Sequence, residues 1–205
     1  MITISRLFDD YDIAARAVGD LERAGIHNSD ISIVASNADG WYDSDRIGHD
    51  RDRDGVDDRR EGADAGAAIG GTMGGAAGLL AGLGMLAIPG LGPVVAAGWL
   101  VSMATVAIGG GVVGGIIGAL TQAGVSEDDA HVYAEGVRRG GTLVTARVPE
   151  ADAVRCEAIL DRSAVDIRER AALYQRSGWR RFDPNALPYT ADEVIRERET
   201  YRTRM

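Results

Sequence analysis

The chain contains no lysine, a single cysteine and few aromatic residues among its 205 residues. All 22 cationic side chains are arginines, and the formal net charge is −9. Because nucleic-acid binding needs clustered cationic side chains, this balance argues against a nucleic-acid partner. The lone Cys156 has no second cysteine with which to form an internal disulfide, and we expect it to be a small core residue.

Formal charge is absent from a long central stretch, since Asp64 is followed by 62 uncharged residues before Glu127. The residues before this stretch carry a net charge of −8, and those after it carry −1. We therefore divide the chain into five segments. They are a first βαβ half (1–38), an acidic linker (39–64), an apolar stretch (65–126), a helix with a second βαβ half (127–172) and a tail with a polar helix (173–205).

The two flanks of the apolar stretch show the same order of elements. Alternating residues predict strands, and apolar residues at helical spacing, such as Ala14, Val18 and Leu21, predict helices. The predicted elements are strand 2–8, helix 11–24 and strand 30–36, then strand 142–148, helix 150–160 and short strand 165–168. A further helix is expected over 127–139, and a capping box at Thr190 and Glu193 predicts a helix towards Tyr201.

Two βαβ halves predict an α+β fold, a ferredoxin-like split βαβ domain with an inserted long apolar glycine-zipper helical hairpin. The hairpin is predicted from glycines spaced four residues apart, which would form a groove along each helix where another backbone approaches closely. Two prolines, Pro89 and Pro93, place the turn, and the second helix is expected over 94–122. The packing glycines are Gly62, Gly66, Gly70, Gly74, Gly78 and Gly82 in the first arm and Gly110, Gly114 and Gly118 in the second.

Each predicted arm exceeds the roughly 20 residues that cross a bilayer, so the first hypothesis is a membrane-inserted hairpin. The alternative is a soluble protein in which such hairpins zip copies together into a homo-oligomer, filament or shell. Glycine, alanine and several hydroxyl side chains make the stretch only mildly hydrophobic, and both interpretations stay open at this point.

The acidic linker contains the sequence DRDRDGVDDRRE at residues 50–61, which fits the calcium loop of EF-hands. A hard cation needs six or seven oxygens converging from one short segment, and this spacing supplies them. The predicted Ca²⁺ ligands are Asp50, Asp52, Asp54, Val56 through its carbonyl, Asp58 and Glu61. The alternative is a solvated linker neutralised by its own arginines.

No catalytic residues are predicted. The histidines, His27, His49 and His131, are scattered through three segments, and no serine or cysteine has an identifiable base partner. We expect a protein that is not an enzyme, and no small-molecule substrate is indicated.

The segments LAGLGMLAIPGLGPVVAAG and GVSEDDAHVYAEGVRRGGTLVTARV, together with the glycine spacing, carry a family resemblance. They resemble bacterial general stress proteins and low-temperature-induced proteins with a glycine-rich central hairpin. The resemblance runs from about Ile2 to Ala172 and implies a stress-induced, non-enzymatic protein with no catalytic residues to carry over.

From the sequence, the leading hypothesis is a stress-response protein anchored by its hairpin in the bacterial inner membrane, with cytoplasmic domains and a calcium-responsive loop. The first alternative is the self-assembling structural protein, located in the cytoplasm, and the second is a calcium sensor. The expected partners are therefore a membrane or further copies of the chain.

Overall fold

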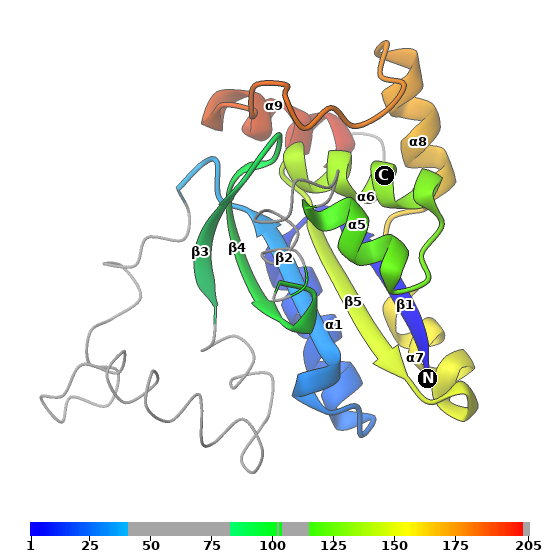
Figure 1. Cartoon of the computed structure of the whole chain (residues 1–205). Coiled ribbons are helices and arrows are strands. Elements are labelled where there is room, and N and C mark those ends of the chain that lie inside the picture. The colour runs from blue at the N-terminus through cyan, green and yellow to red at the C-terminus, as the bar shows by residue number, and fades with distance from the viewer. Residues whose placement is uncertain (41–82, 102, 104–114, 203–205) are drawn as a thin grey trace, which may run out of the picture.

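The computed structural model describes residues 1–40, 83–101, 103 and 115–202. In these ranges the protein is a mixed α+β structure built on a five-stranded antiparallel sheet with the strand order β1-β5-β2-β4-β3 (Figure 1). The strands are β1 (Ile2–Phe8), β2 (Ile31–Ser36), β3 (Gly84–Ile88), β4 (Gly92–Gly98) and β5 (Thr142–Val148). The helices are α1 (Tyr11–Arg23), α5 (Gly115–Gln122), α6 (Glu127–Arg138), α7 (Ala153–Leu160), α8 (Ile167–Arg176) and α9 (Ala191–Arg202), with short 3-10 turns at Asn28–Asp30 and Glu150–Asp152.

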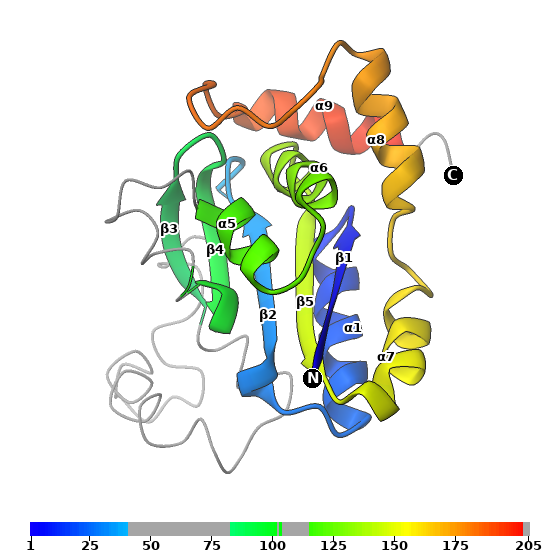
Figure 2. The same ribbon diagram turned by 45° about the vertical axis from the view of Figure 1, so that its right-hand side comes forward.

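Helices cover both faces of the sheet, and each face has its own apolar core (Figure 2). On one face α1 and α7 pack over Ile4, Ile33 and Val144. On the other face α5 and α6 pack over Leu7, Val34 and Leu143. The strict alternation of strand side chains between the two faces follows from the period of two in an extended chain.

The predicted strands 2–8, 30–36 and 142–148 are confirmed as β1, β2 and β5, and the predicted helix 11–24 is confirmed as α1. Local signals explain the ends of the helix. Asp10 caps α1 by accepting the backbone N–H groups of Asp12 and Ile13. Gly25 follows the helix with a φ of +94°, the left-handed conformation that ends helices at glycine. The predicted capping box is also present, because the Thr190 N–H donates to the Glu193 carboxylate at 2.8 Å.

The predicted strand over residues 165–168 is wrong. The Val165 N–H donates one hydrogen bond to the Leu7 carbonyl of β1, at 2.8 Å, and the segment then turns into α8. Asp166 caps that helix by accepting the N–H groups of Arg168 and Glu169. The N-cap at Asp166 therefore starts α8 directly after this one hydrogen bond, and the segment does not continue as a strand.

The predicted second arm of the helical hairpin, residues 94–122, is also wrong. Its first residues form β4, which pairs with β3 through a turn in which Gly90 has a φ of +77°. Gly98, with a φ of +95°, ends the strand close against the Ile31 carbonyl of β2. Among the described residues of this range, helical backbone is found at 99–101 and 103 and in α5, which has eight residues.

None of the helices in the described ranges has the length and apolar character needed to span a bilayer. This finding contradicts the membrane-anchored hairpin and its transmembrane helices, because an eight-residue α5 is far shorter than the roughly 20 residues required. The first arm, with Gly62, Gly66, Gly70, Gly74, Gly78 and Gly82, lies outside the described residues, as do Gly110 and Gly114. Gly118 is the one packing glycine that the structure describes, half-buried in α5.

Candidate functional site

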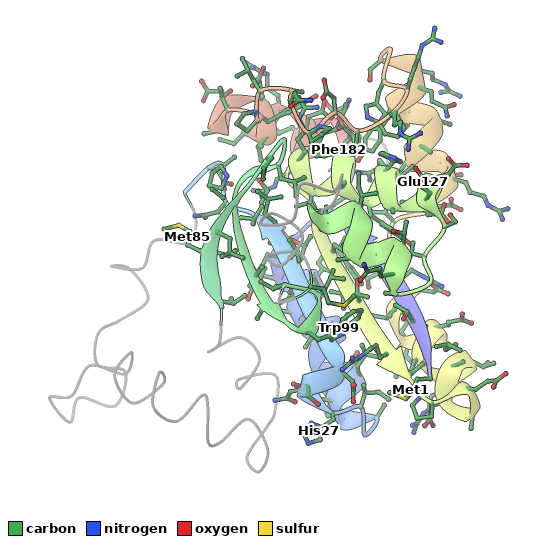
Figure 3. The ribbon with its side chains drawn as sticks, viewed as in Figure 1. Met1, His27, Met85, Trp99, Glu127 and Phe182 are labelled. Carbon is green, nitrogen blue, oxygen red and sulfur yellow. The ribbon has the colours of Figure 1, made fainter. Side chains whose placement is uncertain are left out.

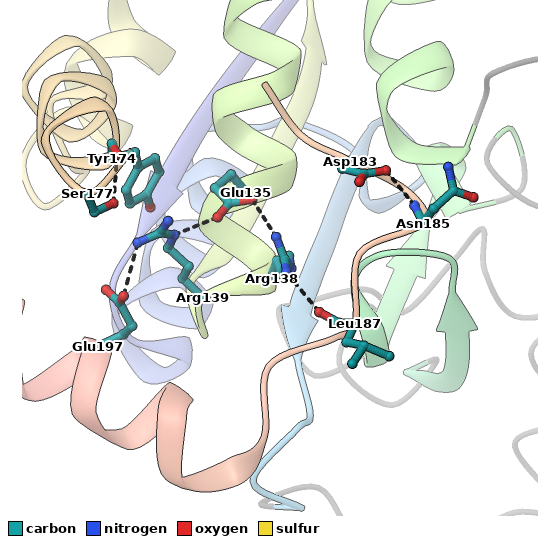
Figure 4. Close-up of polar contacts among 9 residues, drawn as sticks. All are labelled: Glu135, Arg138, Arg139, Tyr174, Ser177, Asp183, Asn185, Leu187 and Glu197. Atoms are coloured by element: carbon teal, nitrogen blue, oxygen red, sulfur yellow. Dashed lines mark hydrogen bonds and ion pairs between the residues drawn. The ribbon is translucent and has the colours of Figure 1, made fainter. Parts of the chain in front are cut away.

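The most densely connected polar cluster in the described structure is centred on Glu135 of α6. Its side chain is fully buried, yet it accepts hydrogen bonds from Arg139 Nε at 2.6 Å and from Arg138 Nη1 at 3.3 Å (Figure 4). The spacings i,i+3 and i,i+4 bring these arginines onto the same side of the helix as the carboxylate. The result is a buried ion triad at the C-terminal end of α6.

Arg139 extends this triad to the last helix of the chain. Its Nη1 donates to Glu197 of α9 at 3.0 Å, and its guanidinium lies 4.4 Å from the ring centroid of Tyr174 in α8. Burial disfavours the charged form of Arg139, but the hydrogen bond and charge of Glu135 outweigh burial and raise its pKa. Arg139 therefore joins α6, α8 and α9 through one permanently charged group.

The segment that contains α9, residues 177–202, is called the C-terminal arm below. It is attached to the rest of the structure at several further points. Arg198 donates to the Asp39 carboxylate just after β2, at 2.5 Å, and to the Gly140 carbonyl at 3.0 Å. Arg138 donates to the Leu187 carbonyl at 2.8 Å. The arm thus crosses the end of the sheet from α8 to the β3–β4 turn (Figure 2).

An apolar contact secures the arm where it passes the β3–β4 turn. Phe182 is 6% exposed and belongs to the core under α5 and α6. A Cβ atom at Gly90 would lie 2.8 Å from the Phe182 ring and 2.7 Å from Pro184, so the absent side chain permits the contact. The arm therefore holds the hairpin of β3 and β4 against the rest of the domain.

A second ion pair supports α8 one helical turn before Tyr174. Arg170 donates to both oxygens of Asp9 at 2.7 and 2.9 Å, and its guanidinium stacks 3.7 Å from the ring centroid of Tyr201. These three residues line a cavity of about 470 Å³. A neighbouring cavity of about 590 Å³ lies beside Arg6 and Tyr133.

The polar groups lining these cavities are engaged in structural contacts. Asp161 accepts Arg6 Nε at 2.5 Å, and Asp166 caps α8. Tyr133 donates to the Ser5 carbonyl at 2.7 Å, and burial raises the pKa of its hydroxyl to about 12. A hydroxyl with that pKa is a poor base near neutral pH, and Asp9, Asp161 and Asp166 are already bound to cations or N–H groups. The contact between Arg170 and Tyr201 joins α8 to the end of the C-terminal arm.

His131 of α6 gives the described structure a pH-sensitive group. Burial, followed by the charge of Arg181, lowers its pKa below the ordinary value of 6.5, against the opposing charges of Glu127 and Asp128. Its Nε2 lies 3.8 Å from the Glu127 carboxylate, which is too long for a hydrogen bond. The folded chain therefore favours the neutral imidazole.

We expect acidification to destabilise the fold partly through this histidine. As the pH falls below about 6.5, the unfolded chain gains a proton that the folded chain resists, so the free energy of unfolding falls. The His131→Phe variant should lose less stability than the parent between about pH 7 and pH 5 in urea titrations. An unchanged slope in His131→Phe would contradict the assignment.

The predicted calcium loop, with Asp50, Asp52, Asp54, Val56, Asp58 and Glu61, lies outside the described residues. Elsewhere, across the ranges that the structure describes, no group of three or more His, Cys, Asp or Glu side chains is placed to hold a metal ion. Cys156 is buried, and burial raises the pKa of its thiol. Calcium binding stays a prediction of the sequence.

Sequence reasoning missed the cluster around Glu135 and Arg139. The i,i+4 spacing of the two residues was visible in the sequence, and such spacing favours an ion pair on a helix. The burial of this pair could not be predicted from the sequence, because Glu197 and Tyr174, which contact Arg139, come from helices far along the chain. No family model, no curated protein and no solved structure matches the chain.

Proposed function

We propose that the chain is a non-enzymatic structural protein that associates with copies of itself through its uncharged stretch. The observation that carries this proposal is the place of that stretch in the fold. Residues 84–88 of it form β3, the outermost strand at one margin of the described sheet. Met85 on this strand is 55% exposed and lies at the margin of the molecule (Figure 3).

Charge distribution supports this choice of surface. The chain carries a net charge of −9, so two copies repel one another over most of their surfaces. The stretch from residue 65 to residue 126 contributes no charge to that repulsion. Contact between copies is therefore least unfavourable where this stretch is exposed.

The contacts of the C-terminal arm inside the molecule support the same proposal. Phe182 and the buried ion triad fix the β3–β4 hairpin to α6, so the outer strand is presented by a rigid support. A preorganised strand loses less conformational entropy on association than a free segment would. The polar cluster then has a structural role, which accounts for its many internal contacts.

The test is the molar mass of the intact chain by light scattering in buffer without detergent, over a range of concentrations. The expected mass exceeds that of one chain, 21.6 kDa, and rises with concentration. The double variant Met85→Lys with Ala87→Lys should shift the mass towards a single chain, because it places charge in the contact. Val154→Lys, at a site that is 79% exposed on α7, is the matched control and should leave the mass unchanged. A mass of one chain at every concentration would refute the proposal.

The proposal also includes a split βαβ arrangement and a connection to the stress response. β5 lies between β1 and β2, and α1 and α7 share one face, as a split βαβ arrangement requires. The connection to the stress response rests on the sequence resemblance alone. It would be tested by following the abundance of the protein after cold or osmotic shock, and constant abundance would contradict it.

A further inference from the structure

The outer edge of β3 presents backbone groups that the described sheet does not use. Ala87 is opposite Pro93 of β4, and proline has no N–H to donate to β3. The Pro93 carbonyl accepts the Asn37 N–H at 2.9 Å, so it points towards β2 and away from β3. Ala87 and Pro93 therefore form a non-hydrogen-bonded pair, and in an antiparallel ladder such pairs alternate with hydrogen-bonded ones. Met85, two residues before Ala87, is in the same kind of pair. Both Met85 and Ala87 therefore direct their N–H and C=O groups away from β4.

Within the part of the chain that the structure describes, this edge lacks the features that usually prevent strands from pairing between molecules. Such features are charged side chains, prolines within the strand, bulges and covering segments. β3 reads Gly-Met-Leu-Ala-Ile, and its nearest charged neighbours in the sequence are Asp64 and Glu127. Among the described strands, none pairs with β3 on this side. An apolar edge of this kind is a template for another strand.

The opposite margin of the sheet is already occupied. The Leu7 carbonyl of β1 accepts the Val165 N–H at 2.8 Å, and the Ser5 carbonyl accepts the Tyr133 hydroxyl at 2.7 Å. These contacts obstruct the approach of a strand to β1. A head-to-tail chain of sheets, β3 on β1 of the next copy, is therefore disfavoured, and pairing of β3 with itself remains.

We infer that a second copy of this chain binds along β3, antiparallel and about a two-fold axis at Leu86, which extends the sheet across both copies. This inference rests on the proposed function and specifies the strand, direction and register through which two copies pair. In this register Met85 of each copy is opposite Ala87 of the other, so both outward residues of the strand exchange N–H···O bonds. The ladder stops at Leu83, whose counterpart would be Pro89.

The register places the two Leu86 residues directly opposite one another as a non-hydrogen-bonded pair. The Cα atoms in such pairs are about 4.5 Å apart, which lies within the range that a disulfide spans. The two Met85 residues are displaced from one another along the strands and fall outside it. A cysteine at each position therefore reports the register directly.

The experiment oxidises the Leu86→Cys and Met85→Cys variants of the intact chain with oxidised glutathione and follows covalent dimers by electrophoresis. The native Cys156 is buried, and the parent chain measures its background. We expect Leu86→Cys to cross-link at least about tenfold faster than Met85→Cys, because geometry limits disulfide formation. Faster cross-linking of Met85→Cys, or equal rates, would overturn the register.

Ala87→Pro tests the edge without a new thiol. It removes an outward N–H and leaves the bonds between β3 and β4 intact, as proline on an edge strand does. The expected result is a molar mass of one chain with an unchanged circular dichroism spectrum. If the parent chain is itself a single chain, both this inference and the proposed function fail. If the parent is oligomeric, and neither Ala87→Pro nor Leu86→Cys behaves as expected, the inference alone fails.

Discussion

Replacing Glu135 with glutamine is expected to lower the free energy of unfolding by about 3 kcal/mol, because removing one partner leaves buried cations without their counter-charge. Glutamine has nearly the same shape, so the change removes charge without opening a cavity. Glu135 is completely buried between Arg138 and Arg139, and water cannot replace the lost carboxylate. The measurement is chemical unfolding followed by circular dichroism.

The matched control for this variant is Glu150→Gln, which removes a carboxylate at an exposed position. It should change the free energy of unfolding by no more than about 0.5 kcal/mol. A double variant, Glu135→Leu with Arg139→Met, should recover part of the stability lost by Glu135→Leu alone, since a well-packed apolar pair often replaces a buried ion pair. A Glu135→Gln chain as stable as the parent would show that the triad does not secure α6.

Truncating Phe182 to alanine is expected to cost about 3 to 5 kcal/mol, the range for large aromatic residues in cores. The ring is 6% exposed and packs in the same core as Leu91, Ile117 and Val137. Its loss leaves a cavity beside the Gly90 turn, and the close approach of Pro184 to that glycine limits collapse of the site.

The matched control is Leu187→Ala in the same segment, where the side chain is 85% exposed. That variant should stay within about 0.5 kcal/mol of the parent. Phe182→Ala should also weaken self-association, because the arm no longer holds the β3–β4 hairpin in place. Equal stabilities for the two variants would contradict a structural role for the arm.

The parts of the fold that could be predicted are those with local signals. Strands β1, β2 and β5 alternate apolar and polar residues, and Asp10, Gly25 and the capping box at Thr190 mark helix ends within a few residues of sequence. Each signal involves residues that are close together in the sequence, so it can be recognised without knowledge of the tertiary structure.

The second arm of the hairpin was predicted wrongly because the composition of its first residues is ambiguous. Short apolar runs rich in glycine and alanine fit a buried helix and a buried strand equally well, and glycine spacing favoured the helix. The positive φ value at Gly98 is incompatible with a helix that runs on from residue 94, whereas Gly90 and Gly92 lie where the turn was predicted. Pairing with β2, which no local pattern encodes, decides in favour of the strand.

Only part of the buried polar cluster could be predicted from the sequence. The spacing of Glu135, Arg138 and Arg139 predicts a helical ion triad, whereas burial and the contacts with Glu197 and Tyr174 depend on the arm folding back over α6. The sequence predicts the tail helix only as a polar helix that begins at the capping box. Val194 and Tyr201 are nevertheless buried against Gly140 and Arg170.

The central claim is that copies of the chain join along β3, and amide hydrogen exchange at this strand tests it most directly. The N–H groups of Leu86 and Ile88 are bound within the β3–β4 ladder, so they should exchange slowly at every protein concentration. The outward N–H groups of Met85 and Ala87 should exchange fast in dilute protein and slow down as concentration rises. Fast exchange of Met85 and Ala87 at concentrations where the chain is oligomeric would contradict the account.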